Sequence, residues 1–116
     1  MKQISEMNTE EIIAAYSDRA PCVYLIGNLD EGFCKIGKSC TPWMRIHALD
    51  SPKLPFPLEM MAILRVGEAD SWVESKLHTA FKHYKVRGEW FEGINPAQFL
   101  RKAKALHKQF RKEYPR

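Results

Sequence analysis

A short polar stretch between two glycines restricts the fold of this chain more than any other feature. Residues 27–32 are mostly turn-forming residues that begin with Gly27 and end with Gly32. An apolar run precedes them at residues 22–26, and a second strand-like run follows at residues 33–38. Two short runs joined by a turn of this kind predict an antiparallel β-hairpin.

The position of the turn decides which residues face each other in this hairpin. If the two glycines close the turn, Tyr24 lies directly across from Lys35, with the two Cβ atoms about 5 Å apart on one face of the sheet. An ammonium group there would favour the ionised form of the phenol, whose pKa is otherwise about 10. A shift of one residue would place Tyr24 across from Cys34 or Ile36 instead. Tyr24 is therefore either a candidate general base or an ordinary strand aromatic.

Helix-start signals and one further strand signal appear in the rest of the chain. Thr41-Pro42 and Asn95-Pro96 each place a capping side chain before a proline, as at many helix starts. Three prolines within residues 51–57 exclude regular structure there. The third strand is expected at residues 58–66. The expected helices run from Asn8 to about Tyr16, from Pro42 to Asp50, from Asp70 to about Tyr84, and from Pro96 onward.

These elements predict an α+β fold in which a small antiparallel sheet is flanked by helices. A chain of 116 residues can form one compact domain with its own core. We expect an N-terminal helical leader at residues 1–20, a central unit at residues 21–92, and a C-terminal basic amphipathic helix at residues 93–116 packed on the same domain.

The net charge of +4 is distributed unevenly along the chain. Residues 1–20 contain two basic and four acidic residues, so the rest of the chain carries a charge of +6. A basic body with an acidic leader suits a polyanion partner such as DNA. A mildly basic surface that serves only solubility is the alternative.

The cysteines and the hydropathy indicate a cytoplasmic protein. No apolar run approaches the length of a membrane span, and the polar start lacks the apolar region of a signal peptide. The three cysteines, Cys22, Cys34 and Cys40, show no C-x-x-C spacing, which favours reduced thiols in a cytoplasmic chain. A zinc site formed by these cysteines and His47 is less favoured than burial as small apolar side chains.

Three further residues are candidates for chemistry on a phosphate group. Arg45, in the first turn of a predicted helix, could bind phosphate oxygens with its guanidinium group, or it could simply be exposed or pair with Asp50. Glu74 and His78 are four residues apart, on one face of a predicted helix. A single carboxylate with retained waters can hold Mg²⁺, but Glu74 is also spaced to form a capping box with Ser71. His78 could position a water, bind phosphate, donate to Glu74, or belong to the core.

Basic residues that could follow a nucleic-acid backbone occur late in the chain and near the second strand. The alternative for those in the last helix is an ordinary solvated face. Within residues 87–91 (Arg-Gly-Glu-Trp-Phe), we expect the two aromatic residues to enter the core and Glu89 to assist the site or pair with Arg87 or a lysine. The candidate nucleic-acid contacts are Lys38, Arg87, Arg101, Lys104 and Lys108.

Taken in order, these short signals resemble the GIY-YIG nuclease superfamily, in particular its small phage and bacterial branch whose second motif is K-I-G. The resemblance covers about residues 21–92. The matching positions are Tyr24 within Val23-Tyr24-Leu25, then Lys35-Ile36-Gly37, Arg45, Glu74 with His78, and Gly88-Glu89-Trp90-Phe91.

The resemblance implies a three-stranded antiparallel sheet flanked by helices, and metal-dependent endonuclease cleavage of DNA, duplex or branched, with Mg²⁺ or Mn²⁺. In that family the tyrosine acts as general base, which here is Tyr24. Arg45 would hold the phosphate, Glu74 would bind the metal, and Lys35 and His78 would assist. No separate recognition domain fits in the remaining residues, so a recognition or targeting protein is a candidate partner, and no membrane is expected.

The chain also departs from the family pattern. Cys22 stands where the first motif has glycine, Lys35 replaces the second motif's tyrosine, and Leu49 occupies the place of a common histidine. The late asparagine of the family has no secure counterpart, because Asn95 fits better as a helix cap. Two alternatives therefore stay open: a weak or inactive nucleic-acid-binding module of the same fold, and a phage or host protein-interaction factor.

Overall fold

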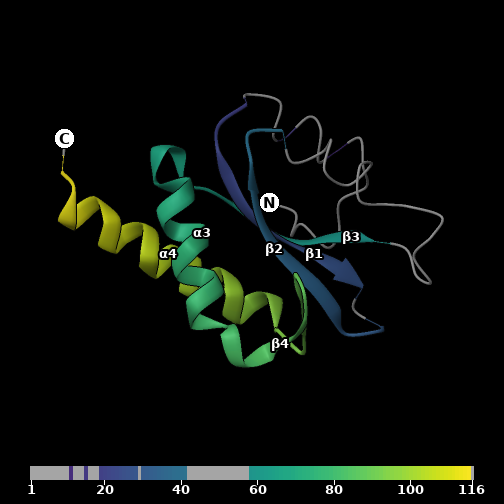
Figure 1. The fold of residues 1–116 in the computed structure, drawn as a ribbon. Coiled ribbons are helices and arrows are strands. Elements are labelled where there is room, and N and C mark those ends of the chain that lie inside the picture. The colour runs from purple at the N-terminus through teal and green to yellow at the C-terminus, as the bar shows by residue number, and fades with distance from the viewer. Residues whose placement is uncertain (1–10, 12–14, 16–18, 29, 42–57, 116) are drawn as a thin grey trace.

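The structure is a computed structural model that describes residues 11, 15, 19–28, 30–41 and 58–115. Within these residues the fold is α+β, with a sheet on one side and helices on the other (Figure 1). The predicted helix at residues 42–50 lies outside the described residues, and so does Arg45. Of the predicted N-terminal helix, the structure describes only Glu11 and Ala15, and both are helical.

The sheet has five strands in the described part of the chain, all paired antiparallel in the order β3-β1-β2-β5-β4. The expected number of three strands was wrong, because the segment around Gly88 forms a second, very short hairpin that joins the edge of β2. Gly88 has a φ of +55° in the turn of that hairpin. The strands are β1 Cys22–Asn28, β2 Phe33–Ser39, β3 Glu59–Arg65, β4 Lys85–Arg87 and β5 Trp90–Glu92.

The first hairpin forms as predicted, but its register differs by two residues. Tyr24 lies across from Gly37, and not from Lys35. Asn28 extends β1 and closes the turn: its side-chain Oδ1 accepts a hydrogen bond from Glu31 N at 3.0 Å, and its carbonyl accepts one from Gly32 N at 2.8 Å. Because an even shift leaves every side chain on its own face, Lys35 still shares a face with Tyr24.

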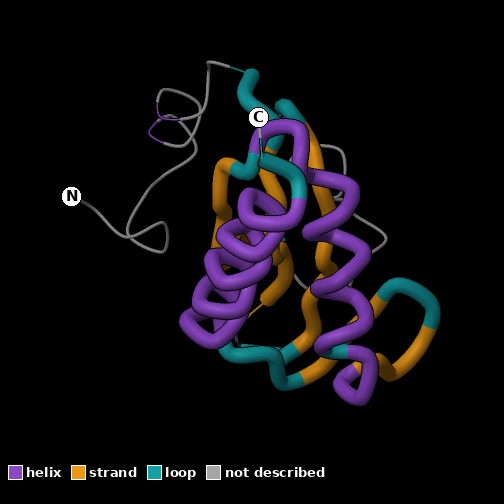
Figure 2. Tube along the Cα trace, turned by 90° about the vertical axis from the view of Figure 1, so that its left-hand side faces the viewer, coloured by secondary structure: helices purple, strands orange, loops and turns teal. Residues whose placement is uncertain are grey.

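Two helices, α3 Asp70–Ala80 and α4 Pro96–Glu113, pack side by side on one face of the sheet (Figure 2). Asn95 caps α4 as predicted, since its Oδ1 accepts hydrogen bonds from the backbone N–H groups of Ala97 and Gln98. Short 3₁₀ turns, η2 Gly67–Ala69 and η3 Lys82–Tyr84, precede and follow α3.

The capping box of Ser71 and Glu74, which their spacing suggested for the start of α3, does not form. The helix begins at Asp70, its N-cap is Ala69, and no side chain caps it. The carboxylate of Asp70 accepts the hydrogen bond from Ser71 N at 2.8 Å, which removes the need for a glutamate to fold back. Glu74 is therefore not committed to the end of its own helix.

The core lies between the sheet and the two helices. Its residues are buried side chains from β1, β2 and β3 together with the inner faces of α3 and α4. Phe91 of β5 and Phe99 of α4 are the largest fully buried side chains. The main contributors are Val23, Leu25, Ile36, Ala62, Val73, Leu77, Phe91, Phe99, Ala103 and Leu106. No helix in the described part of the chain is long and apolar enough to cross a membrane.

Two of the three cysteines are buried as small apolar side chains, which the sequence favoured over a zinc site, and the third is not. Cys22 and Cys34 are buried and Cys40 is exposed. The described residues contain no group of three or more side chains able to hold a metal ion, and His47 lies outside them. Burial raises the pKa of the Cys34 thiol from 9.0 to about 11.

We expect the thiols to differ sharply in reactivity. At pH 8 a thiol reagent should modify Cys40 in the native protein, and it should modify Cys34 only after denaturation, as read by mass spectrometry. Rapid modification of Cys34 in the native protein would contradict its burial.

The raised pKa of Cys34 also predicts how stability depends on pH. The folded state keeps the Cys34 proton that the unfolded chain loses above its ordinary pKa of 9.0, so the free energy of unfolding should fall between pH 9 and about pH 11.

Candidate functional site

A pocket of about 400 Å³ opens where β1, β2, α3 and the turn between β4 and β5 meet. Four of the five residues predicted to carry chemistry line it, as does Lys38 from the predicted nucleic-acid contacts. The fifth, Arg45, lies outside the described residues. The lining residues are Tyr24, Lys35, Ile36, Gly37, Lys38, Glu74, His78 and Glu89.

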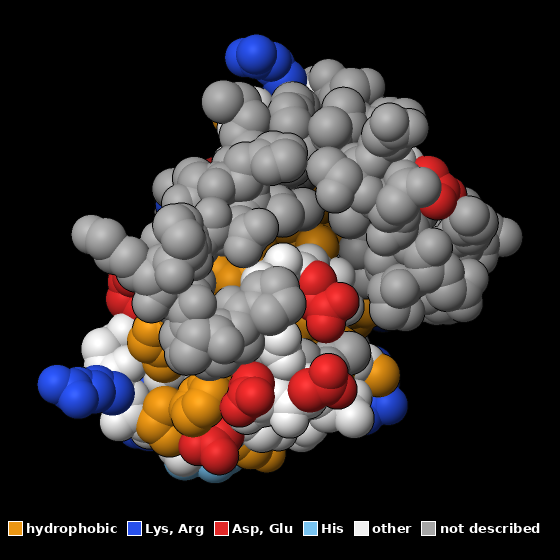
Figure 3. All heavy atoms as spheres, turned by 90° about the vertical axis from the view of Figure 1, so that its right-hand side faces the viewer, with side chains coloured by type: hydrophobic (Ala, Val, Ile, Leu, Met, Phe, Trp, Pro, Cys, Tyr) orange, Lys and Arg blue, Asp and Glu red, His pale blue; other side chains and the backbone are white. Residues whose placement is uncertain are grey.

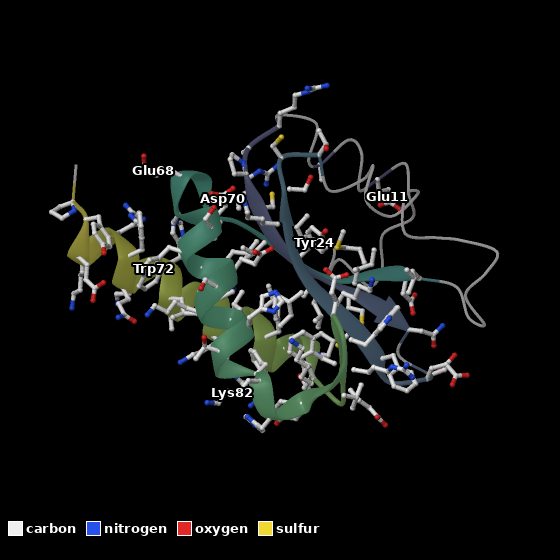
Figure 4. All side chains as sticks on the ribbon, in the orientation of Figure 1. Glu11, Tyr24, Glu68, Asp70, Trp72 and Lys82 are labelled. Carbon is white, nitrogen blue, oxygen red and sulfur yellow. The ribbon has the colours of Figure 1, made fainter. Side chains whose placement is uncertain are left out.

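Tyr24 owes its position to the glycine across from it. The phenol is 4 % exposed and lies at the middle of the sheet, where β1 and β2 run side by side (Figure 4). A Cβ added to Gly37 would lie 2.5 Å from Tyr24 Oη and 2.6 Å from Cζ, so the ring occupies the space that a side chain would need. The sequence pointed to Gly37 only as part of the K-I-G motif, because its steric role depends on the hairpin register.

The edge of β2 changes partner halfway along the strand. The short strand β5 pairs only with Phe33 and Cys34, and beyond them α3 approaches β2. His78 Nε2 donates a hydrogen bond to the carbonyl oxygen of Ile36 at 3.1 Å. A carbonyl can only accept, so the proton of this bond is on Nε2. His78 thus ties α3 to the strand that carries Lys35.

Lys35 lies between an anion and an aromatic ring. Its Nζ is 3.4 Å from Glu89 Oε2 and 4.7 Å from the centre of the Trp90 ring. The lysine side chain is 22 % exposed, whereas that of Glu89 is 83 % exposed. The pairing of Glu89 with a lysine, one of the sequence-based alternatives, is confirmed. An exposed ion pair of this kind contributes little to stability, so a phosphate group can replace Glu89 at Lys35 at small cost.

Glu74 projects from the half-buried face of α3 into the pocket. It forms no hydrogen bond or ion pair with any described residue. Its carboxylate and that of Glu89 are the two anionic groups among the described residues that line the pocket. A single carboxylate together with waters and substrate phosphate is a common way to hold Mg²⁺, and Glu74 is of the type required.

Among the described residues that line the pocket, the charges cancel. Lys35 and Lys38 supply two positive charges, and Glu74 and Glu89 supply two negative ones. Lys38 is also 3.7 Å from the Asp70 carboxylate at the start of α3. The lining by itself therefore exerts little long-range attraction on a polyanion.

The other predicted nucleic-acid contacts do not line this pocket. Arg87 is exposed on β4, while Arg101, Lys104 and Lys108 are exposed on α4. Only Lys38 of the predicted set lies at the pocket. The candidate chemistry and most of the candidate backbone contacts are thus on different parts of the molecule.

The T5orf172 domain model matches residues 21–111, which span the whole sheet, α3 and most of α4. The chain belongs to the T5orf172 domain family. The T5orf172 domain is phage-associated and related to nuclease-like folds of the GIY-YIG and HNH types, and it is compatible with a nuclease-like or DNA-binding role. No curated protein and no solved structure shows significant similarity to the chain. The pocket lies entirely within the matched T5orf172 residues.

Proposed function

We propose that this T5orf172 domain is a metal-dependent endonuclease that hydrolyses DNA phosphodiester bonds in the pocket around Tyr24. The observation that carries the proposal is that Tyr24, Lys35, Glu74 and His78, from β1, β2 and α3, line one open pocket. A phenol, an ammonium group and a carboxylate without an ion pair to any described residue are groups suited to activate water, bind phosphate and hold a cation.

Tyr24 is the proposed general base. The oxygen of a water attacks phosphorus while its proton passes to Tyr24 Oη, and the bond from phosphorus to the leaving oxygen breaks. A phenol with an ordinary pKa near 10 is protonated at neutral pH, so a nearby positive charge must favour the phenolate. Lys35, on the same face of the sheet and lining the same pocket, is the proposed source of that charge.

Glu74 is the proposed ligand for Mg²⁺ or Mn²⁺. The bound cation would supply positive charge against the oxygens on which negative charge grows. His78 is proposed to assist by fixing α3 against β2 through its bond to Ile36, which keeps Glu74 in the pocket that Lys35 also lines. Arg45 remains the predicted phosphate-binding residue from the sequence.

A plasmid assay tests this function. Purified protein should convert supercoiled DNA to nicked or linear DNA with Mg²⁺ or Mn²⁺, and EDTA should stop the reaction. Glu74→Ala should lower the initial rate by roughly 10²–10³-fold, the scale of losing one charge-stabilising group. Glu59→Ala, which removes an exposed carboxylate on β3 away from the pocket, should cut like the wild type. No cutting by the wild type, or equal cutting by Glu74→Ala, would refute the proposal.

The second candidate is a nucleic-acid-binding domain that does not cut. It is supported by the Lys35–Glu89 ion pair, which neutralises a pocket cation, and by the strongly basic α4 outside the pocket. Salt-sensitive DNA binding with no metal-dependent product would favour this candidate. A protein-interaction factor would instead show no DNA binding and a stable complex with another protein.

A further inference from the structure

The helix α4 carries the largest concentration of net positive charge among the described elements. The helix Pro96–Glu113 contains six Lys and Arg residues and one Glu, a net charge of +5, which exceeds the +4 of the whole chain. On the side of the molecule that faces away from α4, several described acidic side chains lie near the lower centre, and the described basic ones lie at the margins (Figure 3). Among the described residues, the attraction for a polyanion therefore comes from α4 and not from the lining of the pocket.

The cations of α4 border a groove against β3. The groove has a volume of about 590 Å³, and no carboxylate is among the described residues that line it. Its four Lys and Arg residues form no ion pair with any described residue. The pKa of His107, which lines the same groove, is lowered mainly by burial and secondly by the positive charge of Arg111. The lining residues are Leu64, Lys104, His107, Lys108, Arg111 and Lys112.

We propose that this groove binds the sugar–phosphate backbone of nucleic acid at a second site, separate from the pocket. Lys104, Lys108 and Lys112 follow one another at intervals of four residues, so they form a row along one face of α4. With a rise of about 1.5 Å per residue the row is about 12 Å long, with one ammonium group roughly every 6 Å. A regular row of unpaired cations suits a regular row of phosphates.

A nucleic-acid backbone fits this groove better than a membrane or a folded protein. Both of those partners usually require large exposed apolar anchors. Among the described residues the large exposed apolar side chains are Val86 and Tyr114, and neither lines the groove. Leu64 is the one apolar lining residue, and it is partly buried against the core.

The groove and the pocket lie on different flanks of the fold. Leu64 is on β3, the outer strand, whereas Lys35 is on β2, with β1 between them. Two strand spacings separate them by roughly 10 Å within the sheet. Lys35 shares the face of Tyr24, while Leu64 packs toward the helices. Binding in the groove thus does not require an occupied or active pocket.

The test is DNA binding without catalysis, measured by fluorescence anisotropy of a labelled duplex in EDTA. Lys104→Glu/Lys108→Glu should weaken binding about tenfold or more, and it should reduce the slope of log K against log salt by about 2, one for each lost phosphate contact. The matched control is Lys82→Glu/Lys102→Glu, which changes the net charge equally at exposed positions outside the groove. It should weaken binding less than about threefold.

Further measurements distinguish DNA binding in the groove from DNA cleavage in the pocket. Glu59→Ala, which changes an exposed residue of β3 outside both the pocket and the groove, should bind DNA like the wild type. A chain that never cuts DNA should still need Lys104 and Lys108 to bind it. Equal losses in the two charge-reversal variants, no loss in the groove variant, or equally tight binding of polyglutamate would overturn the proposal. Matching circular-dichroism melting curves would show that a loss of binding does not come from unfolding.

Discussion

A Gly37→Ala variant should lose DNA cleavage about as completely as Tyr24→Phe, by roughly 10²–10⁴-fold, the usual contribution of a general base. One methyl group has this effect because Cβ of residue 37 would lie 2.5 Å from Tyr24 Oη. Tyr24 is buried, so its ring cannot move aside without disturbing its neighbours. The measurement is the initial nicking rate of supercoiled plasmid with saturating Mg²⁺.

The control for Gly37→Ala is a glycine whose replacement affects stability alone. Gly67 has no atom within 4 Å of an added Cβ, but its φ of +57° strains any other residue. Gly67→Ala should lower the melting temperature and leave the cleavage rate of the folded protein near that of the wild type. If Gly37→Ala cuts as fast as the wild type while Tyr24→Phe does not, the position of Tyr24 against Gly37 is incorrect. If both cut normally, Tyr24 is not the base.

Phe91→Ala should lower the free energy of unfolding by about 3–5 kcal/mol, a large part of the 5–15 kcal/mol that holds a typical domain together. Phe91 is fully buried, and its ring centre is 5.5 Å from that of His78. Its strand β5 joins the rest of the sheet through two residue pairs only, so core packing is the main anchor of the β4–β5 hairpin. Urea denaturation followed by circular dichroism measures the loss.

The neighbouring Glu92 offers a matched control for Phe91→Ala. Glu92 is exposed on the same strand, and Glu92→Ala should change stability by less than about 0.5 kcal/mol. A cost below about 1 kcal/mol for Phe91→Ala would show that β5 is not anchored by this ring. The same variant should also loosen Glu89 and Trp90, which precede Phe91 and hold the Lys35 ammonium group.

Local signals predicted the longer elements of the fold. The first two strands, the strand at residues 59–65 and the cap of α4 at Asn95 each depend on residues close in sequence, and all are confirmed. The strands β4 and β5 were not predicted as a pair because three residues are too few to show alternation. They depend on contacts with β2, which is distant in sequence.

The sequence predicted which residues form the candidate site better than it predicted how they are arranged. Tyr24, Lys35, Glu74 and His78 do line one pocket. The register was missed because the turn is closed at Asn28 and not at Gly27: Asn28 accepts hydrogen bonds from Glu31 N and Gly32 N. The bond from His78 to Ile36 joins residues 42 positions apart, and no sequence pattern indicates such a contact.

The cancellation of charge among the described residues of the pocket has a thermodynamic consequence. A divalent cation beside Glu74 and a phosphate beside Lys35 would each leave the lining with an excess charge that attracts the other. Occupancy by one should therefore favour occupancy by the other, and linkage requires the two enhancements to be equal. DNA should tighten Mg²⁺ binding by the same factor by which Mg²⁺ tightens DNA binding at this pocket, so neither alone reveals the full affinity of the site.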